Sequence, residues 1–397
     1  MVSDADFGTL RITSLRSQAL LSAAVGLFVA GLGAAHFMDV NGHWVTGMNN
    51  HVVWGVPHVF AIFLIIAASG CLNVASLGTV FEIEEYKPYA RIGALLSVAL
   101  LIGGLGVLVL DLGRPDRLVV AMTHFNFASV FTWNVFLYTG FVGVVTLYLW
   151  CLMDPQVRVW AKPVGLLILA WRFVLTSGTG FIFGFLVARD SYDAALLAPL
   201  FVALSLSCGL AVFIVVVTPL CKAIGVPLAS SLTSRMGRLL MQLVLLTLYL
   251  VAALHIGAGY VAEHAGFELF LLANGGGFTT AFWIGFVLFG SLVPALLLAT
   301  PIRESAGMVM VCACLVIAGA FTLLYLIIIA GQVYPMDLVP GYTVVATTFF
   351  DGAPAPYAAS FPELLLGFGG IGFAIALVMF ATRVLRLVPV SQRRPWY

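Results

Sequence analysis

Residues 89–110 read YARIGALLSVALLIGGLGVLVL, and residues 111–117 directly after them read DLGRPDR. The first stretch is long and apolar enough to cross a membrane, because a helical span needs about 20 apolar residues to traverse about 30 Å of hydrocarbon. Stretches of this kind recur along the whole chain. They predict about ten membrane-spanning helices, near residues 17–38, 52–81, 89–112, 129–153, 163–189, 195–221, 234–262, 277–300, 306–331 and 361–387.

The composition agrees with an all-α polytopic membrane protein. Of the 397 residues, 62% are hydrophobic and 9% are charged, which is too apolar for a domain whose surface meets water. Barrel strands are excluded because they would alternate polar and apolar residues. The first apolar stretch exceeds the core of a signal peptide, so we expect a true span there. No change in composition marks a boundary, and residues 1–397 are expected to form one membrane-embedded domain.

Charge and cysteine usage exclude several functions. The net charge is +1 with no basic patch away from the span ends, so no nucleic-acid partner is expected. The six cysteines lie in apolar stretches without a haem-attachment or ferredoxin-like pattern, so the chain is not expected to bind its own c-type haem or iron–sulfur cluster. No metal motif is present either. A haem held by two histidines would require His58 and His255 to face each other.

The distribution of Lys and Arg predicts the orientation. The side that holds both termini carries 14 of these residues and the opposite side carries 3, so both termini are expected to be cytoplasmic. The segment DLGRPDR then lies on the outer side, together with loops 263–277 and 332–360. The longer loop is rich in Pro, Gly and aromatic residues, which is typical of a loop that docks a partner.

The acidic residue that ends the quoted span needs compensation. Asp111 lies at the carboxyl end of a helix, where the helix dipole disfavours it by about 0.3–1 kcal/mol. We expect Gly113 to end the helix, Arg114 to neutralise Asp111, and Pro115 to begin a short helix whose amino end favours Asp116. Two interpretations stay open and are compatible: a salt-bridged turn at the membrane surface, or a site that exchanges protons with a ligand.

Other polar residues are expected at a similar depth. Depths are measured from the outer end of each span, with about 1.5 Å of rise per residue. His58 then lies about 9 Å deep in the second span, Trp133 and Asn134 about 6–8 Å deep in the fourth, and His255 about 10 Å deep in the seventh. Asp111 lies just above this level. A histidine, a carboxylate, an amide and an indole at one depth would suit a flat, amphipathic ligand with two exchangeable hydrogens.

Each of these residues has a structural alternative. His58 could satisfy a carbonyl that the preceding proline frees. Trp54 and Trp133 fit the aromatic belt at the membrane interface. Asn134 and His255 could form hydrogen bonds between helices.

Arg172 is predicted about 13 Å deep in the fifth span, near the middle of the bilayer. A charge there is costly and usually marks a pathway or a site. Thr176, Ser177 and Thr179 follow on the same span and could extend a hydrated proton route. The alternative is a packed pair with a carboxylate, although the sequence offers no carboxylate at a matching depth.

Paired motifs identify a resemblance. Residues 51–70, HVVWGVPHVFAIFLIIAASG, contain W-G-x-P at the start of one span, and residues 111–117 contain D-L-G-R-P at the end of the next. FTWN at 131–134 then opens a third span. The chain resembles the NrfD/PsrC family of membrane subunits, closely over about 40–140 and elsewhere in span count and length. Within the family, residues 43–63 look most like DsrP, the membrane subunit of the DsrMKJOP complex of sulfur metabolism.

The resemblance implies a fold and a set of partners. The core, about 52–331, would form two four-helix bundles, with added helices at about 17–38 and 361–387. Members bind menaquinone or ubiquinone near the outer face of the bacterial inner membrane. They exchange electrons with a periplasmic ferredoxin-like iron–sulfur subunit, and a multihaem cytochrome c and other membrane or cytoplasmic subunits would complete the complex.

The resemblance also implies site residues. His58 falls in the quinone-binding helix, beside the turn that contains Asp111, Arg114 and Asp116. Tyr138 is the nearest candidate for the tyrosine that holds the quinone in some members. Arg172 is compatible with the buried polar residues of proton-translocating complexes.

These observations together predict a quinone-reactive subunit of an electron-transfer complex linked to sulfur metabolism, and not an enzyme on its own. His58 and Asp111 would exchange protons with the ring, Arg114 and Asp116 would shape the entrance, and electrons would pass to a separate iron–sulfur partner. Alternatives are a secondary transporter with discontinuous helices or a b-type cytochrome. The expected site residues are Trp54, His58, Asp111, Arg114, Asp116, Trp133, Asn134 and Tyr138, with Arg172 and His255 on a proton pathway.

Overall fold

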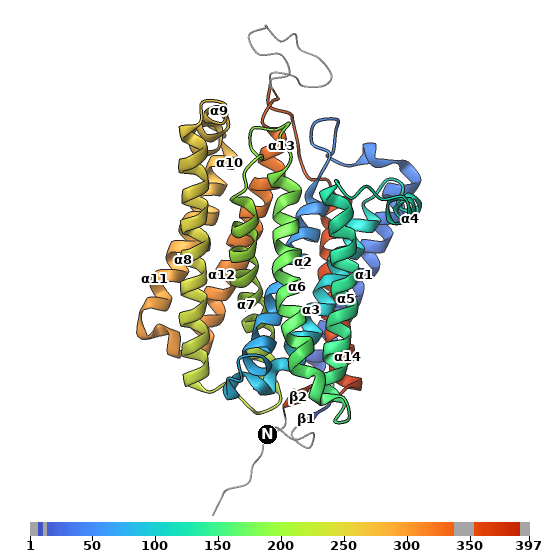
Figure 1. Cartoon of the computed structure of the whole chain (residues 1–397), viewed down its shortest axis with the longest axis vertical. Coiled ribbons are helices and arrows are strands. Elements are labelled where there is room, and N and C mark those ends of the chain that lie inside the picture. Colours follow the sequence, from blue (N-terminus) through green and yellow to red (C-terminus); the bar gives the residue numbers. More distant parts are fainter. Residues whose placement is uncertain (1–6, 11–13, 337–352, 390–397) are drawn as a thin grey trace, which may run out of the picture.

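The computed structural model describes residues 7–10, 14–336 and 353–389. Within them, ten helices are long and apolar enough to cross a membrane, which confirms the all-helical, polytopic prediction (Figure 1). The single-helix spans are α1 (Leu15–Asn41), α2 (Val56–Thr79), α3 (Ala90–Leu110), α5 (Val130–Met153), α6 (Ala161–Gly184), α7 (Leu197–Ala223), α8 (Ser230–Tyr260) and α14 (Phe361–Val384).

Two spans are composite. The eighth joins α10 (Gly277–Thr280), the π-helix η7 (Ala281–Leu292) and α11 (Val293–Ala299). The ninth joins α12 (Ala306–Tyr325), the π-helix η9 (Leu326–Ala330) and α13 (Gly331–Val333).

The second span starts later than predicted. Gly55 caps α2 in an extended conformation and Pro57 occupies its first turn, where the missing N–H costs nothing. His58 therefore lies in the first turn of the helix, and the predicted depth of about 9 Å was wrong. The preceding residues, 52–55, are not helical.

Helix α2 lies at the centre of the molecule and packs against α3 and α7. Eight helical segments around this centre can be described as two groups. One contains α2, α3, α5 and α6, and the other contains α7, α8, α12 and η7. The groups meet where α2 and α7 approach closely. A Cβ on Gly70 would lie 1.9 Å from the carbonyl oxygen of Ser205, so this contact requires glycine.

The first and last spans form a pair outside these groups. Helices α1 and α14 pack along each other, and α14 also packs on α3. Contact is close at Gly31, where a Cβ would lie 2.7 Å from the Cα of Gly369. Below them, β1 (Phe7–Gly8) pairs with β2 (Val388–Pro389) as an antiparallel ladder. The first and last described strands, β1 and β2, therefore lie together at one end of the helices (Figure 1).

Short elements cover the opposite end of the molecule, which we call the outer end after the orientation predicted from the sequence. They are η2 (His43–Val45), η4 (Pro115–Arg117), α4 (Leu118–Thr123), α9 (Ala265–Leu269) and the π-helix η6 (Phe270–Asn274). Most of the predicted docking loop, residues 337–352, lies outside the described residues, as do three of the basic residues used to predict orientation: Arg11, Arg393 and Arg394.

Candidate functional site

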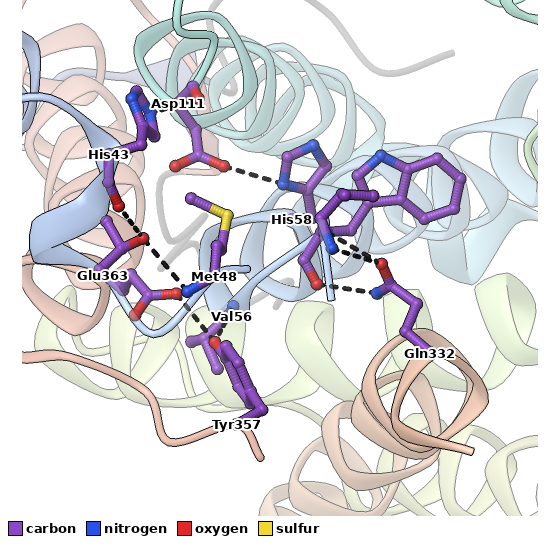
Figure 2. Close-up of polar contacts among 11 residues, drawn as sticks. His43, Met48, Val56, His58, Asp111, Gln332, Tyr357 and Glu363 are labelled. Atoms are coloured by element: carbon purple, nitrogen blue, oxygen red, sulfur yellow. Dashed lines mark hydrogen bonds and ion pairs between the residues drawn. The ribbon is translucent and has the colours of Figure 1, made fainter. Parts of the chain in front are cut away.

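The structure brings His58 and Asp111 together at the outer end of the first helix group. Asp111 caps the carboxyl end of α3, and its Oδ2 lies 2.8 Å from His58 Nδ1 (Figure 2). The carboxylate side chain is 0% exposed and the histidine side chain is 16% exposed. In the described part of the chain, neither carboxylate oxygen accepts a well-aligned hydrogen bond. Since burying a carboxylate without such partners is costly, this pair is poised to interact with a ligand.

A second histidine approaches the same turn. His43 Nε2 lies 2.9 Å from the carbonyl oxygen of Asp111, an acceptor that the helix leaves without an intrahelical partner. His43 belongs to η2, which follows α1. The last turn of α3 is thus held to the segment that precedes α2.

Arg114 does not neutralise Asp111, and that prediction was wrong. Its guanidinium pairs with Asp116, with Nε 3.3 Å from Oδ1, and both side chains are largely exposed. Pro115 begins η4 as predicted and turns the chain away from α3, which carries Arg114 to the surface. The hydrogen bond from Arg114 holds the pKa of Asp116 below its usual range.

Trp54 forms one wall beside His58. The two rings stack with centroids 6.2 Å apart and planes 28° apart. The edge of Phe183, on α6, meets the indole at 5.7 Å, and Phe131, on α5, lies 6.2 Å away. Aromatic rings from two further helices therefore pack against Trp54, the neighbour of His58.

The backbone around Trp54 is held by a residue from the ninth span. Gln332 Oε1 accepts hydrogen bonds from the N–H groups of Val53 and Trp54, both at 3.0 Å, and its Nε2 donates to the Trp54 carbonyl at 2.9 Å (Figure 2). Arg189 donates to the carbonyls of Gln332 and His51 at 2.9 and 2.7 Å. Burial lowers the pKa of this half-buried guanidinium.

A buried glutamate from the last span supports the start of α2. Glu363 Oε2 accepts from the N–H groups of Gly47 and Ser360, at 2.9 and 2.7 Å, and Oε1 accepts from the Tyr357 hydroxyl at 2.8 Å (Figure 2). That hydroxyl in turn accepts from the Val56 N–H at 2.7 Å. Burial and the neighbouring carboxylate raise the pKa of Tyr357, so the hydroxyl keeps the proton that it donates.

Sequence reasoning did not identify Gln332, Tyr357 or Glu363 as site residues. One signal was available for Glu363: the pattern Ser360-x-x-Glu363 before an apolar run is a capping box, and the structure contains both of its hydrogen bonds. Gln332 and Tyr357 had no signal beyond their place at the two ends of the long outer loop.

Two predicted residues connect α5 and α6 instead of contacting the pair. Asn134 Nδ2 donates to the carbonyl of Gly178 at 3.0 Å, and the Tyr138 hydroxyl lies 2.9 Å from Thr179 Oγ1. Both side chains are buried. Asn134 Oδ1 has no hydrogen-bond partner among the described residues, so an acceptor remains one turn along α5 from Phe131.

Trp133 lies away from His58. Its residue is 47% exposed, and its indole N–H donates to the carbonyl of Phe127 at 2.8 Å. Among the described residues, no contact joins Trp133 to His58 or Asp111. The half-exposed indole is compatible with the aromatic belt at the membrane interface, the structural alternative to a site role.

Arg172 is buried in α6, and its Nε and Nη1 donate no hydrogen bond within the described ranges. No ion pair with a carboxylate is found for it among those residues either. The hydroxyl of Thr176 donates back to the Arg172 carbonyl at 2.7 Å, and Thr179 does the same to Leu175 at 2.9 Å. The threonines therefore satisfy their own helix, and the guanidinium remains a buried donor.

His255 lies in different surroundings from His58. Its Nδ1 is 2.8 Å from Glu268 Oε2, and it lines a cavity of about 280 Å³ whose lining does not include His58. His255 therefore has its own carboxylate partner and lies in surroundings separate from those of His58. Among the described residues, no three His, Cys, Asp or Glu side chains are placed to hold a metal ion.

Comparison with known proteins agrees with this architecture. The chain is 27% identical over 376 residues to the Hdr-like menaquinol oxidoreductase integral membrane subunit of Archaeoglobus fulgidus, covering 93% of this chain and 92% of the relative. It is 27% identical over 423 residues to a putative dimethyl sulfoxide reductase membrane subunit of Halobacterium salinarum, covering 98% and 94%.

A shorter relative matches the central part. One of the polysulfide reductase polypeptides of Wolinella succinogenes is 26% identical over 311 residues, which cover 72% of this chain and 96% of that protein. The family model described as polysulphide reductase, NrfD, matches residues 44–336, a range that includes the His58–Asp111 pair but not α14. With most of its length matched, this ten-span chain belongs to the NrfD family of membrane subunits.

Proposed function

We propose that this protein is the quinone-interacting membrane subunit of a multisubunit electron-transfer complex. The single observation that carries the proposal is the contact between His58 and buried Asp111 at the outer end of two neighbouring spans. Relatives named as a menaquinol oxidoreductase subunit and as part of a polysulfide reductase support it. The ligand is menaquinone or ubiquinone, which would exchange with the lipid phase.

The pair is suited to proton exchange with a ring hydroxyl. A carboxylate close to Nδ1 favours the tautomer with a proton on that nitrogen, and this leaves Nε2 as the acceptor. When His58 Nε2 takes a proton from a ligand hydroxyl, Asp111 stabilises the positive imidazole. In the reverse direction the same atoms return the proton. The bound ring itself supplies the electron chemistry.

The walls of the site favour a flat ring. Trp54 offers an aromatic face beside His58, and Phe131 and Phe183 pack against the indole. Asn134 Oδ1 is a buried acceptor without a partner in the described chain and can receive a second hydroxyl hydrogen. Arg114 and Asp116 are exposed on the outer side of the turn, where they would shape the entrance.

An apolar groove next to the site is suited to the prenyl tail of such a ligand. The groove, of about 230 Å³, runs between α1, α3 and α14 and reaches Leu110, the residue before Asp111. Gly103 and Gly106 open its floor, and Phe28 and Phe373 line its sides. Because Leu110 is the residue next to Asp111, a tail lying in the groove would place the ring end of the ligand near the carboxylate.

The remaining parts of the proposal concern partners and place. Electrons would pass between the ring and an iron–sulfur subunit on the outer, periplasmic side, with a multihaem cytochrome c in the same complex. We further propose a bacterial inner membrane with both termini cytoplasmic, and a DsrP-like role in sulfur metabolism. Arg172 is our candidate for a proton pathway through the membrane, since its buried donors have no partner among the described residues.

The two rival functions are less well supported. A b-type cytochrome would need His58 and His255 to share a haem, yet each histidine contacts its own carboxylate in separate surroundings. A transporter would bind its solute near the midplane, whereas the contacting pairs lie at helix ends on the outer side.

The test is quinol oxidation by the complex purified through this chain in mild detergent. We expect His58→Gln and Asp111→Asn each to lower the rate about 100-fold or more, as the loss of a general base usually does. His124→Gln, on the exposed end of α4, is the matched histidine control and should keep the parent rate. Parent rates in both site variants, with the subunits still assembled, would refute the proposal.

A further inference from the structure

The second helix group contains a cavity that the proposed function does not use. It lies at the outer end, between the start of α7, the last turns of α8, α9 and the end of α12, and its volume is about 280 Å³. Its walls are mostly aliphatic. Among the described residues, two polar contacts join segments of the lining. His264 Nδ1 lies 2.8 Å from the carbonyl oxygen of Asp190, and His255 of α8 pairs with Glu268 of α9, with Nδ1 and Oε2 2.8 Å apart and side chains 12% and 8% exposed.

This pair matches the first site in two features. In both, a carboxylate oxygen lies 2.8 Å from Nδ1 of a histidine near the outer end of a span. In both, an aromatic ring contacts the imidazole: Trp54 stacks on His58, and Phe282 meets His255 edge-on with centroids 5.1 Å apart. The same arrangement can therefore bind the same kind of hydroxyl group.

The backbone around the cavity is unusual. The described residues contain three π-helices, η6, η7 and η9, and each contributes to the lining, through Leu271, Phe282, and Leu326 with Ile327. Regular α-helix is more stable in an apolar span, and π-helical segments are found mostly at functional sites. Three of them converging on one cavity indicate a binding site and not a packing defect.

The residues that line the cavity indicate the chemical class of its ligand. Asp190, Asp193 and Glu268 line the cavity and no Lys or Arg does, which disfavours phosphates and other anions. The aliphatic walls disfavour a hydrated metal ion. A neutral ring that donates a hydroxyl hydrogen fits both conditions.

We propose that this cavity is a second binding site for a quinone or quinol ring, held by the His255–Glu268 pair. The choice of ligand class rests on the proposed function, because the first site supplies the chemical precedent. The cavity is large enough for a ring but not for a long tail. The tail would extend past α8 towards the lipid. Gly257, which lines the cavity with open space where a Cβ would stand, is at that side.

The experiment uses the assembled complex and an azide-bearing short-chain naphthoquinone as photo-label, with the labelled peptides identified by mass spectrometry. We expect label near His58 and, separately, near His255. Gly257→Leu should remove the second labelling and keep the first. Gly259→Leu is the matched control, because it lies two residues away on α8, also faces open space and does not line the cavity.

Each outcome decides one of the two proposals. Label near His58 alone, or label near His255 that Gly257→Leu leaves unchanged, overturns the second site and leaves the proposed function standing. Label near His255 alone supports the second site and contradicts the role of His58. No label at either place overturns both. Glu268→Gln gives an independent check, since it keeps the shape of the side chain and should reduce the second labelling about tenfold.

Discussion

At the scale of single residues, the site depends on buried side chains that bind backbone groups of a non-helical segment. Residues 52–55 are not helical, so the N–H groups of Val53 and Trp54 have no helical acceptor. Gln332 Oε1 accepts their hydrogen bonds instead. Without these bonds two buried N–H groups would be left unsatisfied, at about 1–3 kcal/mol each. One amide side chain thus determines where the indole beside His58 lies.

Gln332→Met tests that role. The variant keeps the volume of the side chain and loses its hydrogen bonds, so Trp54 should become mobile and the KM for quinol should rise about tenfold. The rate at saturation should change less, because His58 and Asp111 are untouched. Gln242→Met, on the exposed face of α8, is the control in steady-state kinetics. An unchanged KM would separate Gln332 from ligand binding.

The pair of Arg114 and Asp116 permits a prediction about pH. Because Arg114 lowers the pKa of Asp116, the contribution of the pair is complete above the ordinary Asp value of about 3.9 and is lost as pH falls through the lowered value. Asp116→Asn should therefore change quinol KM by the same factor at pH 6 and at pH 8. A factor that differs between these two values would show that another titrating group acts through this turn.

Sequence reasoning was most successful at Asp111, where a family motif coincides with a negative charge at the unfavourable end of a helix. Asp111 at a helix carboxyl end required a partner, and His58 at the start of the neighbouring span was a candidate at a similar level. The identity of that partner was nevertheless wrong, since Arg114 was expected. Gln332 and Glu363 act across 279 and 316 positions of sequence, and no local pattern predicts such contacts.

At the scale of elements, hydropathy predicted the spans because each must exceed the thickness of the hydrocarbon layer. The π-helices could not be predicted in this way. Within uniformly apolar stretches such as AFWIGFVLFGSL, the α and π forms both present apolar side chains on every face, so hydropathy does not distinguish them. The start of α2 was misplaced for a related reason, since residues 52–54 are as apolar as the helix.

The groove between α1, α3 and α14 gives a prediction at this scale. A Cβ at Gly106 would meet nothing within 4 Å, so Gly106→Leu should fill the groove without disturbing α3. Excluding a tail from the filled groove should cost about 1–3 kcal/mol. The KM for a long-chain quinol should therefore rise about tenfold, while that for an analogue without a tail stays constant.

A matched variant controls for the larger side chain. Gly143 on α5 also has open space around it and does not line the groove, so Gly143→Leu should affect neither substrate. If Gly106→Leu raised the KM of both substrates equally, the groove would not hold the tail.

At the scale of the whole molecule, the grouping of helices was expected from the family resemblance and not from periodicity. In a membrane, lipid-facing and protein-facing sides are both apolar, so no amphipathic pattern shows which helices meet. The pairing of α1 with α14 and the support that α14 gives to the site were not predicted at all. The family model ends before α14, yet Glu363, in the first turn of α14, supports the site.

Glu363→Ala tests this support. Removing the carboxylate leaves the N–H groups of Gly47 and Ser360 and the Tyr357 hydroxyl without an acceptor, which should lower the free energy of unfolding by about 2–4 kcal/mol. Thermal unfolding in detergent should show the loss, together with weaker quinol oxidation. Glu304→Ala, at an exposed position, should change neither. Equal melting curves for both variants would contradict a supporting role.

The pairing of the first span with the last has a consequence for biosynthesis. Helix α1 precedes every other described span in the chain, and its main protein neighbour, α14, is made after all the others. Until then its glycine-lined face can meet only lipid or an assisting insertase. The β1–β2 ladder joins the segments that flank these two helices, so it can form only after α14 has been synthesised.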